Sequence, residues 1–435
     1  MGDPSKDQQR LSKISITPLL KRLWPNPAEE NVTAGEIALA ISHIFTDQLS
    51  SVQTGALLTA LHFTGWDRRA DVIAECAQAM RHAAWCVDTD ALREVVRRRA
   101  RREGTYLGGL CDIVGTGGDS HSTFNISTTS SILASPLLLL SKHGNRASTS
   151  KSGSADLLTS TTPTPPNLNA ITPKSIAKVY ESSNYAFLYA PVFHPGMRYV
   201  ATVRRELGWR TIFNLLGPLA NPVEEALEAR LVGVARRDLG PVFADALKMG
   251  KTKKAMVVCG EEDLDEISCA GRTFCWRLVP RPNPNYRGPG GEEEDSDTSD
   301  DERPPRTLAH VEAFTLSPSD FGLPAHKLSE VSPGRLPHEN AKILMKLLQN
   351  QMPRDDPILH FVLMNTAALF VIAGVCDADT SCMGPGDSGE VIKERGPGDG
   401  RWKEGVRRAR WAVESGEAWK MWNKFVEVSN GLEDI

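Results

Sequence analysis

The sequence predicts an α/β protein, with a small N-terminal helical domain and a large domain built on a mostly parallel central sheet flanked by helices. Residues 16–102 show only the apolar spacing of helices and contain no segment with the composition of a strand. From Leu110 onward, short apolar segments alternate with helical patterns, which is typical of a parallel sheet with crossover helices. A length of 435 residues suits two domains.

We expect the helical domain at residues 16–102, after a disordered tail at 1–15. Thr33 and Glu36 form a capping box before an apolar helix that ends near Phe45, and helical spacing returns at 51–64 and 67–84. The α/β domain is expected at 103–435. Its strands are predicted at 110–114, 137–140, 187–189, 231–234, 255–259 and 309–314.

Two segments of the α/β domain have the composition of flexible inserts. Residues 280–305 are rich in Pro, Gly, Glu and Asp, and residues 377–400 are rich in Gly and Pro. Such segments bury too little apolar surface to order themselves. We therefore expect both to be surface loops away from the active site.

The overall composition excludes several classes of protein. Hydrophobic residues make up 40% of the chain, and the formal net charge of −4 gives no basic excess for nucleic acid or an acidic membrane. No apolar run is long enough to span a bilayer, and the polar N-terminus lacks a signal-peptide core. The eight cysteines form no CxxC pair, which disfavours a zinc site and fits reduced thiols. These features predict a cytoplasmic protein with no membrane or nucleic-acid partner.

A strand, a glycine-rich loop and a helix start follow one another after residue 110. Three glycines come within four residues after the apolar strand 111–114, and glycine allows both positive φ and close approach of a ligand. Asn125, Ser127 and Thr128 then open a helical pattern as candidate capping residues. Free N–H groups at such a helix start favour an anion. A tight turn without a ligand is the alternative for a loop of this kind on its own.

A second polar loop follows the next predicted strand, 137–140. The loop is expected at the C-terminal end of that strand, where α/β proteins bind ligands. It carries Lys142, His143, Asn145 and Arg146, followed by the Ser/Thr/Lys-rich run 148–154. Hydroxyls, backbone amides and a lysine suit phosphate oxygens, whereas a solvated basic turn explains the run poorly.

Six sequence blocks, taken in order, resemble the anthranilate phosphoribosyltransferase family over nearly the whole chain. Their order is far more specific than any one motif. The blocks are Gly115-Thr116-Gly117-Gly118-Asp119, Asn125-Ile126-Ser127-Thr128, Lys142-His143-Gly144-Asn145-Arg146, Val203-Arg204-Arg205-Glu206-Leu207-Gly208, Arg210-Thr211-Ile212-Phe213-Asn214-Leu215-Leu216-Gly217-Pro218-Leu219 and Asp263-Leu264-Asp265-Glu266-Ile267-Ser268.

The resemblance implies transfer of a phosphoribosyl group from phosphoribosyl pyrophosphate to anthranilate, a step of tryptophan biosynthesis. It also implies a homodimer and a contribution of residues 171–207 to the helical domain. The residues that match the phosphoribosyl-pyrophosphate site are Gly115, Gly118, Asp119, Thr123, Asn125, Ser127, Thr128, Lys142, Asn145, Arg146, Ala147, Ser148, Thr149, Ser150 and Ser154.

A magnesium site is also expected from the resemblance. Cleavage of the C1–O bond leaves a highly charged pyrophosphate, which Mg²⁺ stabilises while bound by few carboxylates. Asp265 and Glu266 match the family's metal pair, although a bare acidic run is more often a solvated loop. Ser127 matches the hydroxyl ligand of a second Mg²⁺, and capping the helix is its alternative role.

The resemblance implies an anthranilate site formed by Gly115, His143, Asn145, Arg204, Gly217 and Pro218. The resemblance gives Arg204 as the partner of the anthranilate carboxylate, which a planar guanidinium suits, and Arg205 is expected to be the surface arginine. His143 is assigned to binding, because a weakly basic aromatic amine is nucleophilic while neutral and needs no strong general base.

Two other functions are open at this point. A pyrimidine nucleoside phosphorylase shares the fold, but the blocks around Arg204 and Asp265-Glu266 disfavour it. A non-catalytic nucleic-acid-binding relative would need a basic stripe, which the net charge of −4 disfavours.

Overall fold

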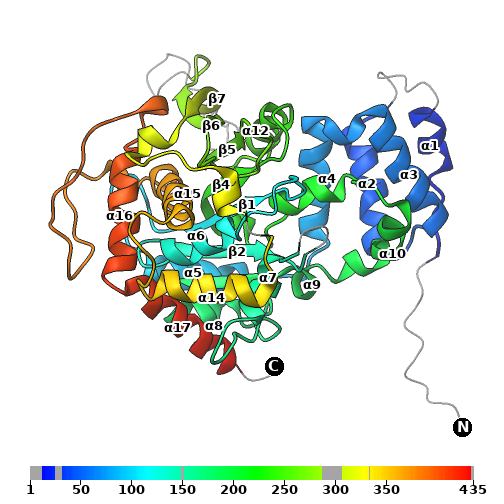
Figure 1. Ribbon diagram of the computed structural model, residues 1–435. Coiled ribbons are helices and arrows are strands. Elements are labelled where there is room, and N and C mark those ends of the chain that lie inside the picture. Colours follow the sequence, from blue (N-terminus) through cyan, green and yellow to red (C-terminus); the bar gives the residue numbers. More distant parts are fainter. Residues whose placement is uncertain (1–11, 25–31, 148–150, 287–305, 333, 433–435) are drawn as a thin grey trace, which may run out of the picture.

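The N-terminal helices lie to one side of a large sheet that is covered by helices on both faces (Figure 1). The computed structural model describes residues 12–24, 32–147, 151–286, 306–332 and 334–432. The helical part contains α1 (Thr17–Leu23), α2 (Ala34–Phe45), α3 (Ser51–Thr64) and α4 (Ala70–His82). The later α10 (Arg198–Leu207) joins it by packing against α2 and α3.

The helices of this part begin and end where the sequence predicts. Thr33 Oγ1 accepts a hydrogen bond from Glu36 N (3.2 Å), and the Glu36 carboxylate accepts one from Thr33 N (3.1 Å), so the predicted capping box is confirmed. Ser50 caps α3, which ends at Gly65 with φ of +81°. The spacing of Ile37 and Ile41 gives α2 a buried face, against which α4 packs.

The sheet has seven strands in the order β3-β2-β1-β4-β5-β6-β7 among the described residues. The strands are β1 (Leu110–Gly115), β2 (Leu139–Gly144), β3 (Tyr185–Tyr189), β4 (Leu227–Gly233), β5 (Lys254–Gly260), β6 (Thr273–Pro282) and β7 (Thr307–Leu316). The first five strands in this order are parallel, and β6 and β7 add an antiparallel edge. The expected mostly parallel α/β sheet is confirmed.

The strand β6 was not expected from the sequence. It alternates buried and half-exposed side chains, as in Cys275 and Trp276, and it ends in a Pro-Arg-Pro run. A half-buried strand lacks the continuous apolar run that marks the buried parallel strands. Residues 280–282, expected in the first insert, therefore belong to β6, and 287–305 lie outside the described residues.

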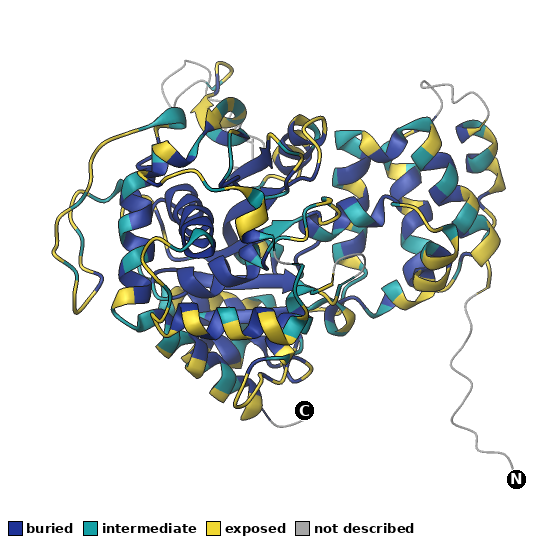
Figure 2. Ribbon diagram, in the orientation of Figure 1, coloured by how far each residue is buried: buried dark blue, intermediate teal, exposed yellow. Residues whose placement is uncertain are grey.

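Helices cover both faces of the sheet and bury it (Figure 2). α15 (Pro357–Ala373) is the central one: every residue from Ile358 to Ala373 is buried, and the helix packs on β4, β5, α6 (Ile126–Ala134) and α16 (Trp402–Glu414). α12 (Leu239–Met249) covers the opposite face and also contacts α4. The remaining helices include α7 (Ser154–Thr159), α9 (Ala190–Phe193), α11 (Phe213–Leu216), α13 (Leu328–Val331), α14 (Pro337–Leu348) and α17 (Glu417–Asn430).

The expected boundary of the helical domain at residue 102 lies too far along the chain. The apolar stripe of α5 (Thr89–Arg99), formed by Leu92, Val95 and Val96, is buried in the core of the α/β part. α8 (Ile176–Ser182), expected among the helices of the small domain, packs on α5, β3 and α17 instead. Within 171–207, α10 and the short 3-10 helix η3 (Pro195–Met197) contact the helical part.

Residues 377–400 are bound to α16 by a set of polar contacts. Asp387 accepts hydrogen bonds from Met383 N (2.9 Å), Ser381 Oγ (2.8 Å) and Arg407 Nη1 (2.8 Å). The flexibility of residues 377–400 stays a prediction, and these contacts argue against it. Residues 1–11 of the expected tail lie outside the described residues, whereas Ile14 N donates to Gln48 O (2.9 Å).

Candidate active site

Two adjoining cavities open at the carboxyl ends of β1 and β2. One, of about 670 Å³, is enclosed by the loops after these strands and is called the loop cavity here. The other, of about 550 Å³, contains His143 and His194 and is called the histidine cavity. The residues that line both are Val114, Gly115, Thr116, His143, Gly144, Asn145, Arg146 and Asn214.

The predicted residues separate between the two cavities. All described members of the expected phosphoribosyl-pyrophosphate set line the loop cavity, as do Asp265 and Glu266. All members of the expected anthranilate set line the histidine cavity: Gly115, His143, Asn145, Arg204, Gly217 and Pro218. Ser148, Thr149 and Ser150 lie outside the described residues.

The glycines after β1 are required by close approach of other groups. A Cβ on Gly115 would lie 2.2 Å from Asp265 Oδ2, and one on Gly118 would lie 1.2 Å from Arg210 Nη1. Gly117 and Gly118 also have positive φ, +63° and +77°, which L side chains rarely adopt. The loop therefore brings its backbone N–H groups against the carboxylates, and Gly117 N donates to Asp265 Oδ2 (2.7 Å).

Two half-buried carboxylates, Asp265 and Glu266, lie in the turn after β5, and Glu266 contacts the start of α6. Glu266 Oε1 accepts a hydrogen bond from Ser127 N (3.3 Å), while Glu266 Oε2 is buried without a hydrogen-bond partner. Burial, with Asp119 nearby, raises the pKa of Asp265 to about 7. Burial, with Asp265 nearby, raises the pKa of Glu266 well above its usual range. Neighbouring carboxylates with a buried, unpartnered oxygen fit a hard cation.

A ready-made metal cluster is not part of this arrangement. Among the described residues, no group of three or more His, Cys, Asp or Glu side chains is placed to hold a metal ion. A cation at Asp265 and Glu266 would therefore need further oxygen ligands from a hydroxyl, water or the ligand itself. Mg²⁺ commonly binds in this way, through one or two carboxylates and substrate phosphates.

Lys142 supplies a buried positive charge to the loop cavity. Its side chain is 2% exposed, and burial lowers its pKa although Asp112 and Glu266 oppose that change. Asp112 is buried beside it, and burial raises the pKa of that carboxyl. A lysine held without a close ion pair at a cavity wall suits an anionic ligand.

Asn125 connects the two loops instead of capping α6. It occupies the N-cap position, but its side chain makes no capping bond. Its Nδ2 donates to Ser152 O (2.9 Å), and its Oδ1 accepts from Ser152 Oγ and from Asn340 Nδ2 of α14 (both 3.0 Å). The expected capping role of Asn125 is therefore wrong, because the neighbouring loop offers its side chain stronger partners than the helix end does.

The second loop is held by Asp156 in the first turn of α7. Asp156 Oδ2 accepts from Ala147 N (2.8 Å) and Gly153 N (3.2 Å), and its Oδ1 accepts from Arg146 Nη1 (3.2 Å). Thr128 Oγ1 donates to Ser154 Oγ (2.9 Å) across the cavity floor. These bonds hold the described residues on either side of the loop in place.

The histidine cavity combines imidazoles with apolar walls. The rings of His143 and His194 lie 5.1 Å apart, and His143 Nε2 is buried without a hydrogen-bond partner. Burial, with His194 and Lys142 nearby, holds the pKa of His143 well below its usual range, and burial lowers that of His194 to about 4. Both rings are therefore neutral near pH 7, and the cavity carries no imidazolium charge.

Arg204 reaches the histidine cavity from α10, whereas Arg205 does not line it. The Arg204 guanidinium carbon lies 5.7 Å from the ring centre of Phe213. Burial lowers its pKa, and Arg210 adds a smaller effect in the same direction. Arg205 instead donates to Thr202 Oγ1 (3.3 Å) at the surface. A partly buried guanidinium over an aromatic ring suits a planar aromatic carboxylate.

Several lining residues were missed by the sequence reading. Arg210 lies over Gly118, and its Nη2 donates to Thr116 O (3.4 Å). Asn214 lines both cavities, and Arg198 and His194 line the histidine cavity. Arg210 and Asn214 belong to the sequence block 210–219 that resembles the family, so the sequence did carry a signal for these two residues. His194 follows α9 and carried no local signal.

The fold and the paired cavities define a two-domain transferase of sugar groups. The family described as "Glycosyl transferase family, a/b domain" matches residues 107–282 and 290–419, and the "helical bundle domain" of the same name matches residues 17–84. Among curated relatives, the anthranilate phosphoribosyltransferase of Schizosaccharomyces pombe is 37% identical over 391 residues, which cover 90% of this chain and 91% of the relative. That of Saccharomyces cerevisiae is 32% identical over 97% of this chain and 100% of the relative.

Solved structures agree with these relatives. The anthranilate phosphoribosyltransferase from Saccharomyces cerevisiae in complex with PRPP and Mg superposes with a TM-score of 0.72 and 29% identity, over 95% of this chain and 97% of that one. The enzyme from Thermus thermophilus gives a TM-score of 0.69 and 29% identity, over 95% and 99%. The chain belongs to the anthranilate phosphoribosyltransferase family.

Proposed function

We propose that this protein transfers the 5-phosphoribosyl group of phosphoribosyl pyrophosphate to the amine of anthranilate, as part of tryptophan biosynthesis. The products are N-(5′-phosphoribosyl)anthranilate and pyrophosphate. The observation that carries the proposal is the pair of adjoining cavities, which share a wall of Gly115, His143 and Asn145. Two substrates bound on either side of one wall are placed to react with each other.

The loop cavity is the proposed site of phosphoribosyl pyrophosphate. Its wall supplies Lys142, the start of α6 and the glycine-rich loop, all of which suit phosphate oxygens. Arg210 adds a second cation beside the loop. The partly buried setting strengthens each of these contacts, because water screens them less than at the surface.

Mg²⁺ is the proposed metal, and Asp265, Glu266 and the hydroxyl of Ser127 are the residues that would hold it. The unpartnered Glu266 Oε2 and the raised pKa values of Asp265 and Glu266 support this assignment, because a cation favours the charged form of both groups. Bound there, the metal would neutralise charge that develops on the pyrophosphate leaving group.

The histidine cavity is the proposed site of anthranilate. Arg204 would bind its carboxylate, and Phe213 with the apolar walls would contact its ring. His143 and His194 are neutral near pH 7, so they contribute shape and hydrogen bonding without charge. Anthranilate carries a neutral amine at this pH, and the reaction needs no strong general base.

A homodimer formed through the helical domain is part of the proposal. Large apolar side chains are exposed on this part of the molecule, and Phe63 packs edge-on against Trp209 with ring centres 5.9 Å apart. The exposed fractions are 60% for Leu39, 82% for Val52, 66% for Phe63 and 40% for Trp209. Exposed apolar clusters of this kind mark contact surfaces. Sedimentation should give twice the mass of one chain, and a single-chain mass would contradict this part.

The cellular setting rests on composition. No described helix is long and apolar enough to pass through a bilayer. A net charge of −4 gives no basic surface for nucleic acid. We propose a cytoplasmic location with the two small substrates as partners.

The direct test follows the fluorescence of anthranilate in the presence of purified protein, phosphoribosyl pyrophosphate and Mg²⁺. Fluorescence should decay only when all components are present, and EDTA should stop the decay. A folded protein that gives no decay would contradict the proposed acceptor. Phosphorolysis of uridine and thymidine would then test the nucleoside phosphorylase alternative.

A further inference from the structure

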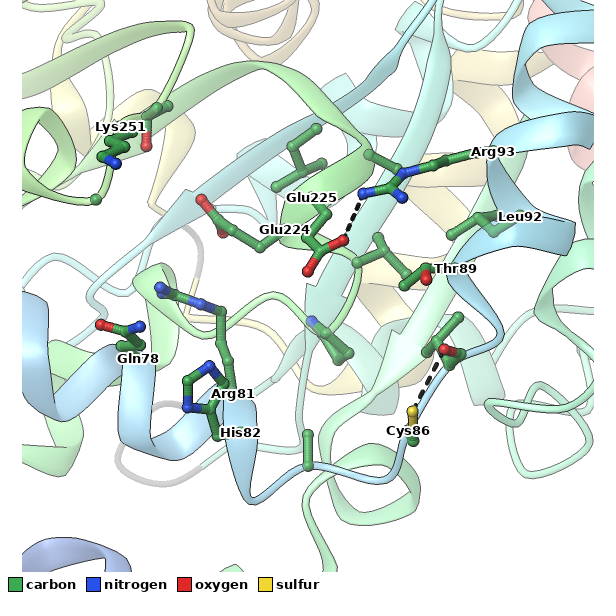
Figure 3. A pocket seen from close by; sticks show the side chains of 18 of the residues that line it. Gln78, Arg81, His82, Cys86, Thr89, Leu92, Arg93, Glu224, Glu225 and Lys251 are labelled. Atoms are coloured by element: carbon green, nitrogen blue, oxygen red, sulfur yellow. Dashed lines mark hydrogen bonds and ion pairs between the residues drawn. The ribbon is translucent and has the colours of Figure 1, made fainter. Parts of the chain in front are cut away.

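A third cavity, of about 540 Å³, lies on the side of the molecule away from the loop cavity, between α4, α5, η5 (Glu224–Ala226) and the turn 250–253. It is called the back cavity here. Figure 3 shows Gln78, Arg81 and His82 on one wall and Glu224, Glu225 and Arg93 on the other. Arg81 connects this cavity to the proposed anthranilate site.

The turn 217–220 is held by three side chains through three successive carbonyl groups. Arg81 Nη1 donates to Leu219 O (2.6 Å), and His194 Nε2 bonds to Ala220 O (3.0 Å). Arg230 Nη2 donates to Pro218 O, and its Nη1 donates to Glu224 (2.7 and 2.9 Å). Three charged or polar donors on consecutive carbonyls fix the position of the turn more firmly than its short 3-10 helix can.

The same turn forms part of the histidine cavity. Gly217 and Pro218 line that cavity together with His194, whereas Arg81 and Arg230, which bond to the carbonyls of Leu219 and Pro218, do not line it. A shift of the turn would therefore change the depth of the acceptor cavity without touching the loop cavity, since neither residue lines the latter.

The three donors come from different parts of the molecule. Arg81 is in the last turn of α4 in the helical part, Arg230 is in β4, and His194 follows α9. Met80, next to Arg81, lines the histidine cavity directly. The turn is thus bound to both the helical part and the sheet, so its position depends on how the two parts are placed.

We propose that Arg81, Arg230 and His194 form a carbonyl clamp that positions the turn 217–220, and that Arg81 makes anthranilate binding depend on the placement of the helical domain. This inference rests on the proposed function, because it assigns anthranilate to the histidine cavity. Arg81 is a positioning residue: it contacts the turn and not the substrate.

Arg93 provides a matched control within the same cavity. It is also an arginine of the back cavity, and it pairs with Glu225 (2.6 Å). Among the described residues, it forms no hydrogen bond or ion pair with the turn 217–220, and its side chain is 53% exposed. Loss of Arg93 removes a surface charge and an exposed ion pair, which contributes little to stability.

The experiment compares Arg81→Ala, Arg81→Lys and Arg93→Ala in the full-length protein by steady-state kinetics in both substrates. Arg81→Ala should raise the KM of anthranilate about ten-fold while the KM of phosphoribosyl pyrophosphate changes less than about two-fold. Arg81→Lys keeps one donor and should recover part of the loss. Arg93→Ala should match the wild type.

Three outcomes would overturn the clamp. The first is an equal rise of both KM values in Arg81→Ala, and the second is identical behaviour of Arg81→Ala and Arg93→Ala. The third is an Arg81→Lys variant that recovers none of the loss although its melting temperature stays at the wild-type value. A wild-type protein without activity on anthranilate would instead contradict the proposed function, so the two failures are distinguishable.

Discussion

The loop cavity and the histidine cavity share a wall but are built in different ways. The loop cavity consists of α/β-domain segments, mostly two loops and the Asp265-Glu266 pair, whose carboxylates accept hydrogen bonds from backbone N–H groups. The histidine cavity takes its walls from α4, α10 and the turn 217–220 as well as from the strands. The loop cavity therefore depends mainly on segments of one part of the molecule, whereas the histidine cavity depends on how distant parts of the chain are assembled.

The two cavities also differ in how burial acts on their titratable groups. Burial raises the pKa of Asp265 and Glu266 in the loop cavity, and it lowers the pKa of His143 and His194 in the histidine cavity. In both cavities, burial disfavours the charged form of these groups. A bound cation would favour the charged carboxylates of the loop cavity, whereas the histidines of the other cavity stay neutral beside an aromatic ring.

The largest effect is expected from removing the charge of the Asp265-Glu266 pair. Asp265→Asn combined with Glu266→Gln should lower kcat/KM by about 10³-fold or more, because the metal that stabilises the leaving group is no longer held. Excess Mg²⁺ should not restore activity. The measurement is the rate of fluorescence decay of anthranilate at saturating phosphoribosyl pyrophosphate across a Mg²⁺ titration.

The matched control for this pair is Glu261→Gln in the same acidic run. Glu261 is exposed and paired with Arg272 (2.6 Å), so its loss should leave kcat/KM near the wild-type value. Full activity of the double variant would contradict the proposed metal role of the pair. It would also contradict the difference between the two cavities on the donor side.

A smaller and more selective effect is expected from Arg204→Ala. The loss of one charge-assisted contact, worth about 1.5–3 kcal/mol, should raise the KM of anthranilate about 10- to 100-fold. The KM of phosphoribosyl pyrophosphate should stay nearly unchanged, because Arg204 does not line the loop cavity. Arg205→Ala is the neighbouring control. Equal weakening of both substrates would show that the cavities are less independent than their construction indicates.

The smallest effect concerns stability against pH. The native pKa of His194 is about 4 and an unfolded histidine titrates near 6.5, so between these values the unfolded chain binds the extra proton. His194 therefore gives its full stabilisation above about pH 6.5, and that stabilisation is lost as pH falls toward 4. Raised carboxyl pKa values act in the opposite sense, since Asp265 at about 7 favours the folded state more at low pH.

Urea unfolding of the wild type and His194→Asn between pH 4 and pH 6.5 separates the two contributions. The variant should gain less stability per pH unit than the wild type, with a difference of up to about 1.4 kcal/mol per pH unit. Equal slopes in the two proteins would mean that the imidazole is not buried in its neutral form.

Much of the fold and of the donor site could be predicted because their signals are local in sequence. The central strands are continuous apolar runs, and the glycines, Lys142 and the acidic pair lie within short blocks. The structure brings these blocks together around one cavity. The roles of individual residues in binding stay predictions.

The misses share a different property, because each depends on a neighbour far away in the chain. β6 is a half-buried strand that is stabilised by pairing with β5 on one side and β7 on the other, and α5 belongs to the α/β core because its apolar stripe meets α8. Asn125 turns from its helix to Ser152 and Asn340. Arg210 lies over Gly118, although the two residues are far apart in the sequence. Local secondary-structure propensity and residue spacing carry no information about partners far away in the chain.

The position of α15 in the chain has a consequence for synthesis. This helix is buried from Ile358 to Ala373 and packs on β4, β5 and α6, all of which leave the ribosome much earlier. Until it emerges, one face of the finished strands lacks its cover, and nascent chains with bare apolar sheet faces aggregate readily. The order of translation thus leaves the α/β domain open to chaperones until nearly the end, while the first four helices can already be folded.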